Sequence, residues 1–236
     1  MLHKTKGIVI KSTPFKESSI VCKIFTEKFG LQTYIINSVR SAGKTGKAAL
    51  FQPLTILDLV VYKHEHKKME RISEVKLVHH FSQINFDVAK NTTAFFIAEL
   101  LHKVIYEEEN NNDFFEWLEN KLIELDATET LNASFHLDFM LQVSKHFGFY
   151  PHENSTETTN YFDLMNGIFQ QEIPSHFNYL SKNDSTLFAI FLNDSNALQN
   201  RIQRKKVLQI LCDYFALHIP NFGKMKSPDV LAAMFD

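Results

Sequence analysis

The stretch INSVRSAGKTGKAALFQP, residues 36–53, is the part of the chain whose residue types most resemble a phosphate-binding site. It carries Arg40, Lys44 and Lys47, two glycines and no acidic residue. A nucleotide-hydrolysing P-loop requires the pattern G-x-x-x-x-G-K-[ST]. The first glycine-lysine pair lacks a glycine five positions earlier, and the second is followed by alanine instead of serine or threonine. We therefore exclude a P-loop and predict a loop that approaches the phosphates of a polyanion.

The distribution of charge along the chain favours that interpretation. Residues 1–80 carry 14 Lys and Arg against 6 Asp and Glu, whereas the rest of the chain carries 11 against 21. Such an asymmetry is typical of a polyanion-binding region joined to an acidic body. The alternative, that residues 36–53 form a solvated basic loop with no partner, stays open at this point.

Residues that could do other chemistry occur singly. His64 and His66 form an H-x-H pair, but lysines follow them, so we predict a surface turn there and the same for His79 and His80. Cys22 and Cys212 lie far apart and are predicted to be small buried apolar residues. The motifs G-x-S-x-G, H-E-x-x-H and C-x-x-C do not occur in the sequence, and Asp138 and Asp163 are predicted to be structural. We therefore expect the protein to have no enzymatic activity, no cofactor and no metal site.

A second basic cluster, RIQRKK, lies in the acidic part of the chain. Arg201 and Lys205 are one helical turn apart, and Lys206 follows. The cluster fits either the solvated face of an amphipathic helix or a contact for an acidic peptide or for nucleic acid.

The elements that must position these residues change character near residue 80. Residues 1–80 contain five short runs rich in Ile and Val that alternate with polar residues, which predicts a small closed barrel of the oligonucleotide-binding (OB) type. On this barrel we expect Phe15 and Tyr34 to be exposed for stacking on bases, with Lys11 and Lys16 as further phosphate contacts.

Residues 81–236 predict an α-helical domain, so the fold class is α+β. Apolar residues recur at helical spacing in residues 91–109, 113–125 and 134–149, and the first of these helices is expected to bury Phe95. Asp113 is expected to cap the second helix. A loop and small β-hairpin without cysteine are predicted at about residues 149–180, followed by further helices.

With these elements in place, the chain resembles the bacterial recombination mediator family RecO. The resemblance rests on GIVIKSTPFKESSIVCKIFTEKFGLQTYIINSVR, ALFQPLTILDLVVY, FGFYP, YFDLMNGIF and FALHIPNFGKMKSPDVLAAMF. It implies an N-terminal OB barrel, a helical C-terminal domain, and a non-enzymatic DNA repair protein that binds single- and double-stranded DNA and anneals complementary strands. It also implies partnership with RecR in loading RecA onto strands coated by single-stranded DNA-binding protein (SSB), and a grip on the acidic, phenylalanine-ended SSB tail.

The sequence departs from the family in two places. After the third strand the usual lysine-glycine-alanine-arginine is replaced by residues 37–40, so only Arg40 corresponds to a matched phosphate contact, and Lys44 and Lys47 are candidates from charge alone. Four zinc-binding cysteines of many members are missing from residues 147–169. We therefore expect no zinc and a hairpin held by the packing of Phe149, Tyr161, Phe162 and Phe169.

The resulting hypothesis is a cytoplasmic, nucleoid-associated recombination mediator that contacts DNA, RecR and SSB, and RecA indirectly, without a membrane. DNA contacts are predicted at Arg40, Lys44, Lys47, Lys11, Lys16, Phe15 and Tyr34, and SSB-tail contacts at Arg201, Lys205 and Lys206. The alternative is an OB-fold scaffold for protein or RNA with no role on DNA.

Overall fold

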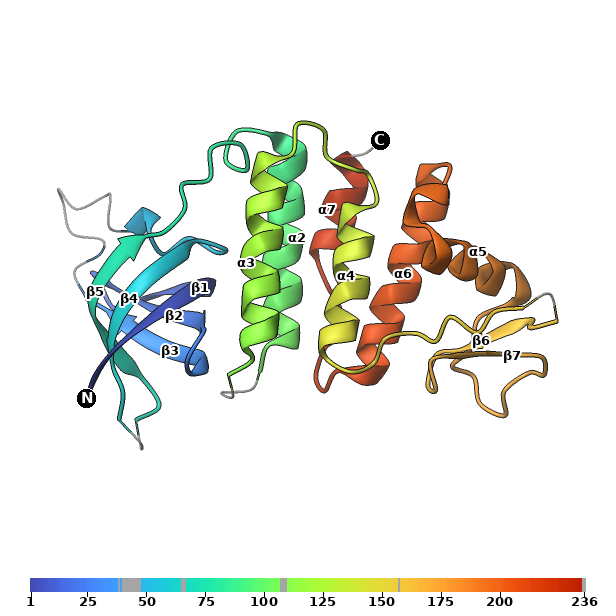
Figure 1. The fold of residues 1–236 in the computed structure, drawn as a ribbon, viewed down its shortest axis with the longest axis horizontal. Coiled ribbons are helices and arrows are strands. Elements are labelled where there is room, and N and C mark those ends of the chain that lie inside the picture. The colour runs from blue at the N-terminus through green and yellow to red at the C-terminus, as the bar shows by residue number, and fades with distance from the viewer. Residues whose placement is uncertain (38, 40–47, 65–66, 107–109, 157, 235–236) are drawn as a thin grey trace. The chain divides into compact units, whose positions relative to one another are not determined.

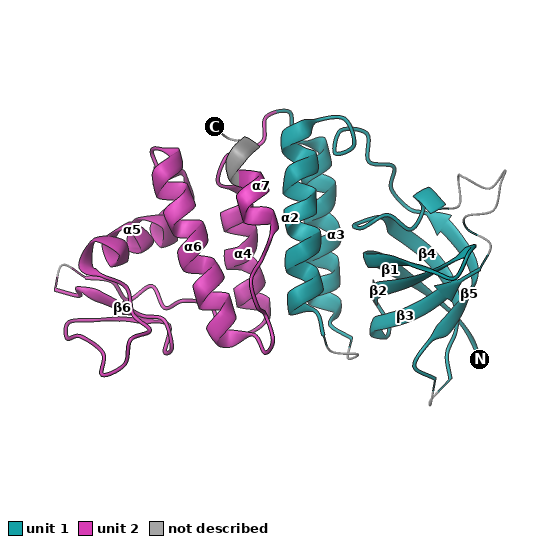
Figure 2. Ribbon diagram, turned by 180° about the vertical axis from the view of Figure 1, so that it is seen from behind, with its two compact units in different colours: residues 1–129 teal, residues 130–236 magenta. Residues whose placement is uncertain are grey.

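A computed structural model describes residues 1–37, 39, 48–64, 67–106, 110–156 and 158–234. The chain divides into two compact units, Met1–Glu129 and Thr130–Asp236, coloured separately in Figure 2. Among the described residues, the first unit contains a β-barrel and two long helices, and the second contains helices and a strand pair (Figure 1). The boundary between the compact units falls after residue 129, because two helices that follow residue 80 cluster with the barrel. The division into domains at residue 80 stays a prediction.

The barrel is closed by five strands in the order β1-β2-β3-β5-β4. All neighbours pair antiparallel except β3 and β5, which are parallel. The closed five-stranded barrel and the helical region that follows confirm the predicted fold class. The strands are β1 (Leu2–Phe15), β2 (Ser19–Thr26), β3 (Gly30–Ile36), β4 (Ile56–Tyr62) and β5 (Glu70–Leu77).

Alternating residues of these strands fill the barrel with aliphatic side chains, as the period of two requires. Gly7 of β1 permits the closest approach, since a Cβ built there would lie 2.6 Å from Cγ2 of Ile24 and 2.8 Å from Cδ1 of Leu59. Any larger residue at this position would force the side chains of Ile24 and Leu59, on the two strands that flank β1, to move.

Two long helices complete the described part of the first unit. They are α2 (Val88–Val104) and α3 (Asn112–Ala127), which lie side by side in both views (Figures 1 and 2). The ring of Phe25 on β2 lies 5.6 Å from that of Phe114 and 5.7 Å from that of Phe115, so α3 is packed on the barrel through aromatic contacts. This packing explains why the compact unit includes the two helices.

Two details of these helices differ from the sequence-based expectation. Phe95 is 64% exposed, so the prediction that it is buried is wrong, and α2 uses its neighbours Phe96 and Ile97 for the core instead. Helix α3 is capped by Asn111, whose side chain accepts a hydrogen bond from the N–H of Phe114 at 3.0 Å. Asp113, the predicted cap, lies inside the first turn, where its charge favours the helix dipole.

The segment between the barrel and α2 is fixed by one buried carboxylate, that of Asp126 on α3. Its oxygens accept hydrogen bonds from the backbone N–H groups of Ser82, Gln83 and Ile84 at 2.8–3.0 Å. Its backbone carbonyl accepts a bond from the buried ammonium of Lys90 at 2.9 Å. Burial alone would raise the pKa of Asp126, but the backbone hydrogen bonds outweigh it and hold the pKa below its usual value.

In its described residues, the second unit is built from four α-helices, a 3-10 turn and one strand pair. The helices are α4 (Phe135–His146), α5 (Lys182–Asn193), α6 (Arg201–His218) and α7 (Ser227–Met234), with the 3-10 turn at Ser195–Ala197. The strand pair consists of β6 (Tyr161–Asp163) and β7 (Ile168–Gln170). This agrees with the predicted hairpin, which turns at Gly167, where φ is +66°.

Aromatic packing holds the hairpin against the helices, as expected from the sequence. The ring of Phe162 lies 4.7 Å from Phe169 and 4.8 Å from Phe188 of α5. Phe149 packs edge-on to Phe215 of α6 at 4.9 Å, and Tyr161 contacts a neighbouring tyrosine. The hairpin is thus attached through its apolar face.

A polar cluster around Asp163 supplements this packing. The buried carboxylate accepts hydrogen bonds from the N–H groups of Met165 and Asn166 and from the side-chain amide of Asn166, at 2.7–3.1 Å. His176 Nε2 lies 3.2 Å from the same carboxylate. These contacts order the turn of the hairpin and the segment after it, which is consistent with the structural role predicted for Asp163.

Among the helices that the structure describes, none combines the length and the apolar character needed to cross a bilayer. Within the same residues, no three His, Cys, Asp or Glu side chains gather in a way that could hold a metal ion.

Candidate nucleic-acid interface

The β1–β2 turn brings a cation and an aromatic ring together at one end of the barrel. Phe15 ends β1 and is half-buried, and Lys16 follows with a φ of +53°. This backbone conformation sends the chain sharply back into β2 and leaves the Lys16 ammonium 5.5 Å from the centre of the Phe15 ring. A phosphate beside Lys16 and a base against the edge of Phe15 could both be accommodated there.

The basic loop that carries Arg40, Lys44 and Lys47 lies outside the described residues, but its start is fixed beside this turn. Val39 is buried, and its N–H donates a hydrogen bond to the carbonyl of Ser18 at 2.8 Å. The Ser19 hydroxyl donates to the Asn37 side-chain oxygen at 3.1 Å. The chain therefore enters the cationic loop directly next to the turn.

Lys11 is exposed on the same strand. Its Nζ lies 3.0 Å from Nε2 of His102 on α2, a residue that the sequence did not single out. The polar surroundings of Lys11 thus include helix α2 as well as the barrel.

Tyr34 does not belong to this surface, and the prediction that it is exposed is wrong. It is 1% exposed and packs in the barrel core with Val9 and Cys22. Burial, and then the nearby charge of Glu70, raise its pKa. The reason is the strand period: Tyr34 shares a face of β3 with the inward-pointing Ile36, so it fills the barrel and cannot stack on a base.

The cysteines and the H-x-H histidines that were considered as possible reactive groups can now be compared with their surroundings in the structure. Cys22 is buried, which raises the pKa of its thiol to about 11, so it is not a reactive nucleophile. Cys212 is only half-buried, which corrects the prediction that both cysteines are buried; it borders a surface groove beside α6. His64 is half-exposed at the end of β4, and its Nδ1 lies 2.9 Å from the buried carboxylate of Glu70, while His66 lies outside the described residues.

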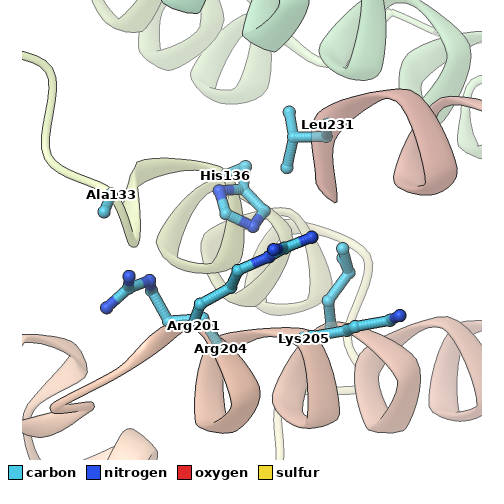
Figure 3. A pocket seen from close by; sticks show the side chains of 7 residues that line it. Ala133, His136, Arg201, Arg204, Lys205 and Leu231 are labelled. Atoms are coloured by element: carbon cyan, nitrogen blue, oxygen red, sulfur yellow. The ribbon is translucent and has the colours of Figure 1, made fainter. Parts of the chain in front are cut away.

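In the second unit the cationic side chains of α6 border a small pocket against α4. Figure 3 shows Arg201, Arg204 and Lys205 lying along one helix, with the ring of His136 facing them from α4. The remaining wall is Ala133, Leu208 and Leu231. Burial, followed by the charge of Arg204, lowers the pKa of His136 to about 3, so its ring is neutral at physiological pH.

A second groove continues from this pocket along α6. Its volume is about 370 Å³, and it shares Lys205 and Leu208 with the first pocket. Lys224 and Met225 line its other side. Asp213 and Asp229 also border this groove. It is therefore the first, smaller pocket that sets cations beside the apolar Leu208 and Leu231 without an acid, an arrangement that suits an acidic peptide with a hydrophobic end.

Of the three cations predicted for this site, the structure brings Arg201 and Lys205 to the pocket. Lys206 does not line it and instead lies 3.0 Å from the carboxylate of Asp184 on α5. Sequence reasoning missed Arg204 and His136. The four-residue spacing of Arg204 and Leu208 on α6 could have pointed to Arg204, but His136 comes from another helix.

Comparison with known proteins agrees with this architecture. The family description "Recombination protein O N terminal" matches residues 1–81, and "Recombination protein O C terminal" matches residues 85–228. Over its whole length the chain is 38% identical to DNA repair protein RecO of Flavobacterium psychrophilum, 34% to that of Flavobacterium johnsoniae and 31% to that of Bacteroides fragilis. Each of these relatives is also covered completely.

The barrel, the helical region and these matches define the class of the protein, a DNA repair and recombination protein with an N-terminal OB-type barrel. Within that class, the chain belongs to the RecO family.

Proposed function

We propose that the protein is a non-enzymatic recombination mediator that holds DNA by its sugar–phosphate backbone and leaves the bases available for pairing. The observation that carries this proposal is the cationic end of the barrel, where Lys16 and Phe15 stand beside the entry to the basic loop. Exposed lysines and one aromatic edge suit contacts that do not depend on sequence. Annealing of complementary strands requires that kind of contact, because bases held by specific hydrogen bonds could not pair.

Affinity in such an interface comes mainly from the counterions that the cations displace from DNA. It should therefore fall steeply with salt and vary little with sequence. The acidic remainder of the chain disfavours further wrapping of DNA and leaves surface for protein partners, among which we propose RecR and, through it, RecA loading on SSB-coated strands.

The groove along α6 is the proposed seat of the SSB tail. An acidic peptide that ends in an aromatic residue needs cations next to an apolar slot, and Arg201, Arg204 and Lys205 border one with Leu208 and Leu231. On this proposal, His136 contributes a neutral wall and not a charge, because its pKa is far below physiological pH.

Fluorescence anisotropy with two unrelated single strands and a duplex tests the proposal. We expect binding of all three at low salt, similar affinity for the two single strands, and a steep loss between low and moderate salt. Binding that is absent at low salt, or that favours RNA strongly over both DNA forms, would instead support the alternative of a protein- or RNA-binding scaffold.

A further inference from the structure

Two lysines face each other across the β1–β2 pair of the barrel. Lys11 and Lys23 are direct partners in the antiparallel register, so their side chains lie on the same face of the sheet. Like charges directly opposite each other destabilise a sheet. An arrangement of this kind is relieved when an anion lies between the two ammonium groups.

The third member of the cluster comes from a helix. His102 is in the last turn of α2, and its Nε2 is 3.0 Å from Nζ of Lys11. An ammonium group has only donors, so Nε2 must accept, and the ring is neutral with its proton on Nδ1. Burial, and then the charges of Lys11, Lys23 and Lys103, lower the pKa of His102, while Glu99 on the same helix opposes them. Four basic side chains from three elements, Lys11, Lys23, His102 and Lys103, thus lie near one another.

Another lysine of β1 also lies beside a helix, but its partner there is an acid and not a histidine. Lys6, five residues earlier, meets the carboxylate of Glu119 on α3 at 2.9 and 3.0 Å. Where the strand passes α2, the residue that meets Lys11 is a histidine and not an acid. Glu119 thus matches the positive charge of Lys6, whereas His102 adds no negative charge beside Lys11.

We propose that Lys11, Lys23 and His102 together form a seat for one backbone phosphate of DNA, so that the DNA-binding surface extends from the barrel onto helix α2. The inference rests on the proposed function and adds to it a specific site. When a phosphate enters, Lys11 and Lys23 donate to its oxygens. His102 then gains a proton from solvent at Nε2 and donates as well, so that binding at this seat is accompanied by uptake of one proton.

This proton uptake gives the seat a distinct signature. A bound phosphate favours the charged form of His102, so its pKa is higher in the complex than in the uncomplexed protein. Affinity therefore rises as the pH falls through the range between those two values, and the increase disappears when the imidazole is replaced by a group that does not titrate.

The test uses the full-length protein and a mixed-sequence single strand, with anisotropy measured across salt and pH. Lys23→Gln keeps the length of the side chain and removes its charge. Lys76→Gln is the matched control, because Lys76 is an exposed barrel lysine whose direct register partner is Asp58. We expect Lys23→Gln to weaken binding several-fold and to reduce the salt slope by about 0.7, the value for one phosphate contact on a single strand. Lys76→Gln should leave both close to wild type.

His102→Gln supplies the second readout. Wild-type affinity should rise between pH 8 and pH 6 by more than that of His102→Gln, and thermal melting should show both proteins folded. If Lys23→Gln matches Lys76→Gln, or if the two pH profiles coincide, the phosphate seat is overturned although the DNA-binding function stands. If wild type fails to bind at low salt, the proposed function fails first.

Discussion

Nζ of Lys6 on β1 lies 2.9 and 3.0 Å from the two carboxylate oxygens of Glu119 on α3, so a single ion pair links the barrel to a helix 113 residues later in the chain. The hydrogen bond from Lys6 and the charge of Glu119 raise the pKa of the lysine, against a smaller opposing effect of burial. The pair complements the aromatic contacts of Phe25 with α3.

Glu119→Gln should therefore destabilise the first unit by up to about 1 kcal/mol, because the lysine is partly exposed and its pair is screened by water. A double-mutant cycle with Lys6→Met in urea denaturation measures the coupling. Since the folded pKa of Lys6 is raised, this stabilisation is present below its ordinary value of 10.5 and is lost as the pH rises through the folded value. A coupling of zero would show that the pair does not link strand and helix.

The buried carboxylate of Asp126 should contribute considerably more to the unfolding free energy than the Lys6–Glu119 ion pair does. Asp126→Ala leaves the N–H groups of Ser82, Gln83 and Ile84 without their acceptor, which we expect to cost about 2 kcal/mol or more in unfolding free energy. Its depressed pKa means that the contribution is present above the unfolded value near 3.8 and is lost as the pH falls through the lower, folded value. Glu124→Ala, an exposed acid two residues earlier on α3, is the control, and equal losses of stability for both would contradict the assignment.

His136 should make the second unit sensitive to mild acid. Its pKa is about 3 in the folded chain against an ordinary value of 6.5, so between these values the unfolded chain binds a proton that the folded chain does not. Stability is therefore full above pH 6.5 and falls with decreasing pH by about 1.4 kcal/mol per unit from this one group. The unfolding free energy of His136→Gln, measured in urea between pH 7 and pH 4.5, should lose that part of the slope. The same slope in both proteins would mean that folding does not lower the pKa of His136.

The peptide groove on α6 can be tested with a synthetic acidic peptide that ends in phenylalanine. Lys205→Glu reverses a charge at the junction of the two pockets and should weaken binding at least about tenfold, consistent with the loss of a charge-assisted contact and the gain of a repulsion. Lys206→Glu is the matched comparison on the same helix, since Lys206 is outside the pocket and pairs with Asp184. Isothermal titration calorimetry that gives equal losses for the two variants would place the peptide elsewhere.

Local patterns in the sequence were sufficient to predict the barrel, the helices and the cysteine-free hairpin. Strand alternation in residues 1–80 and helical spacing in residues 113–125 each depend on residues close together in the chain. Phe95 was misassigned because α2 is apolar on much of its circumference, so a stripe could be drawn through either Phe95 or its buried neighbour Phe96.

The polar contacts that fix the units could not be predicted in the same way. Asp126 bonds to a segment more than 40 residues earlier, and the His136 ring meets cations about 65 residues later in the chain, so no local spacing reveals either partner. The same is true of Lys11 and His102, which are separated by 91 residues. Tyr34 is a different case, because the alternation of β3 already favoured a buried position and its ring was misread as a stacking platform.

The most direct test of the account is the salt dependence of single-strand binding when Arg40, Lys44 and Lys47 are all replaced by alanine. If the protein holds DNA by its sugar–phosphate backbone, the loss of affinity should be equal for unrelated DNA sequences. The salt slope should be lower by up to about 2, the sum for three phosphate contacts. Affinity and slope that remain at wild-type values in the folded triple variant would contradict the claim that this loop holds DNA.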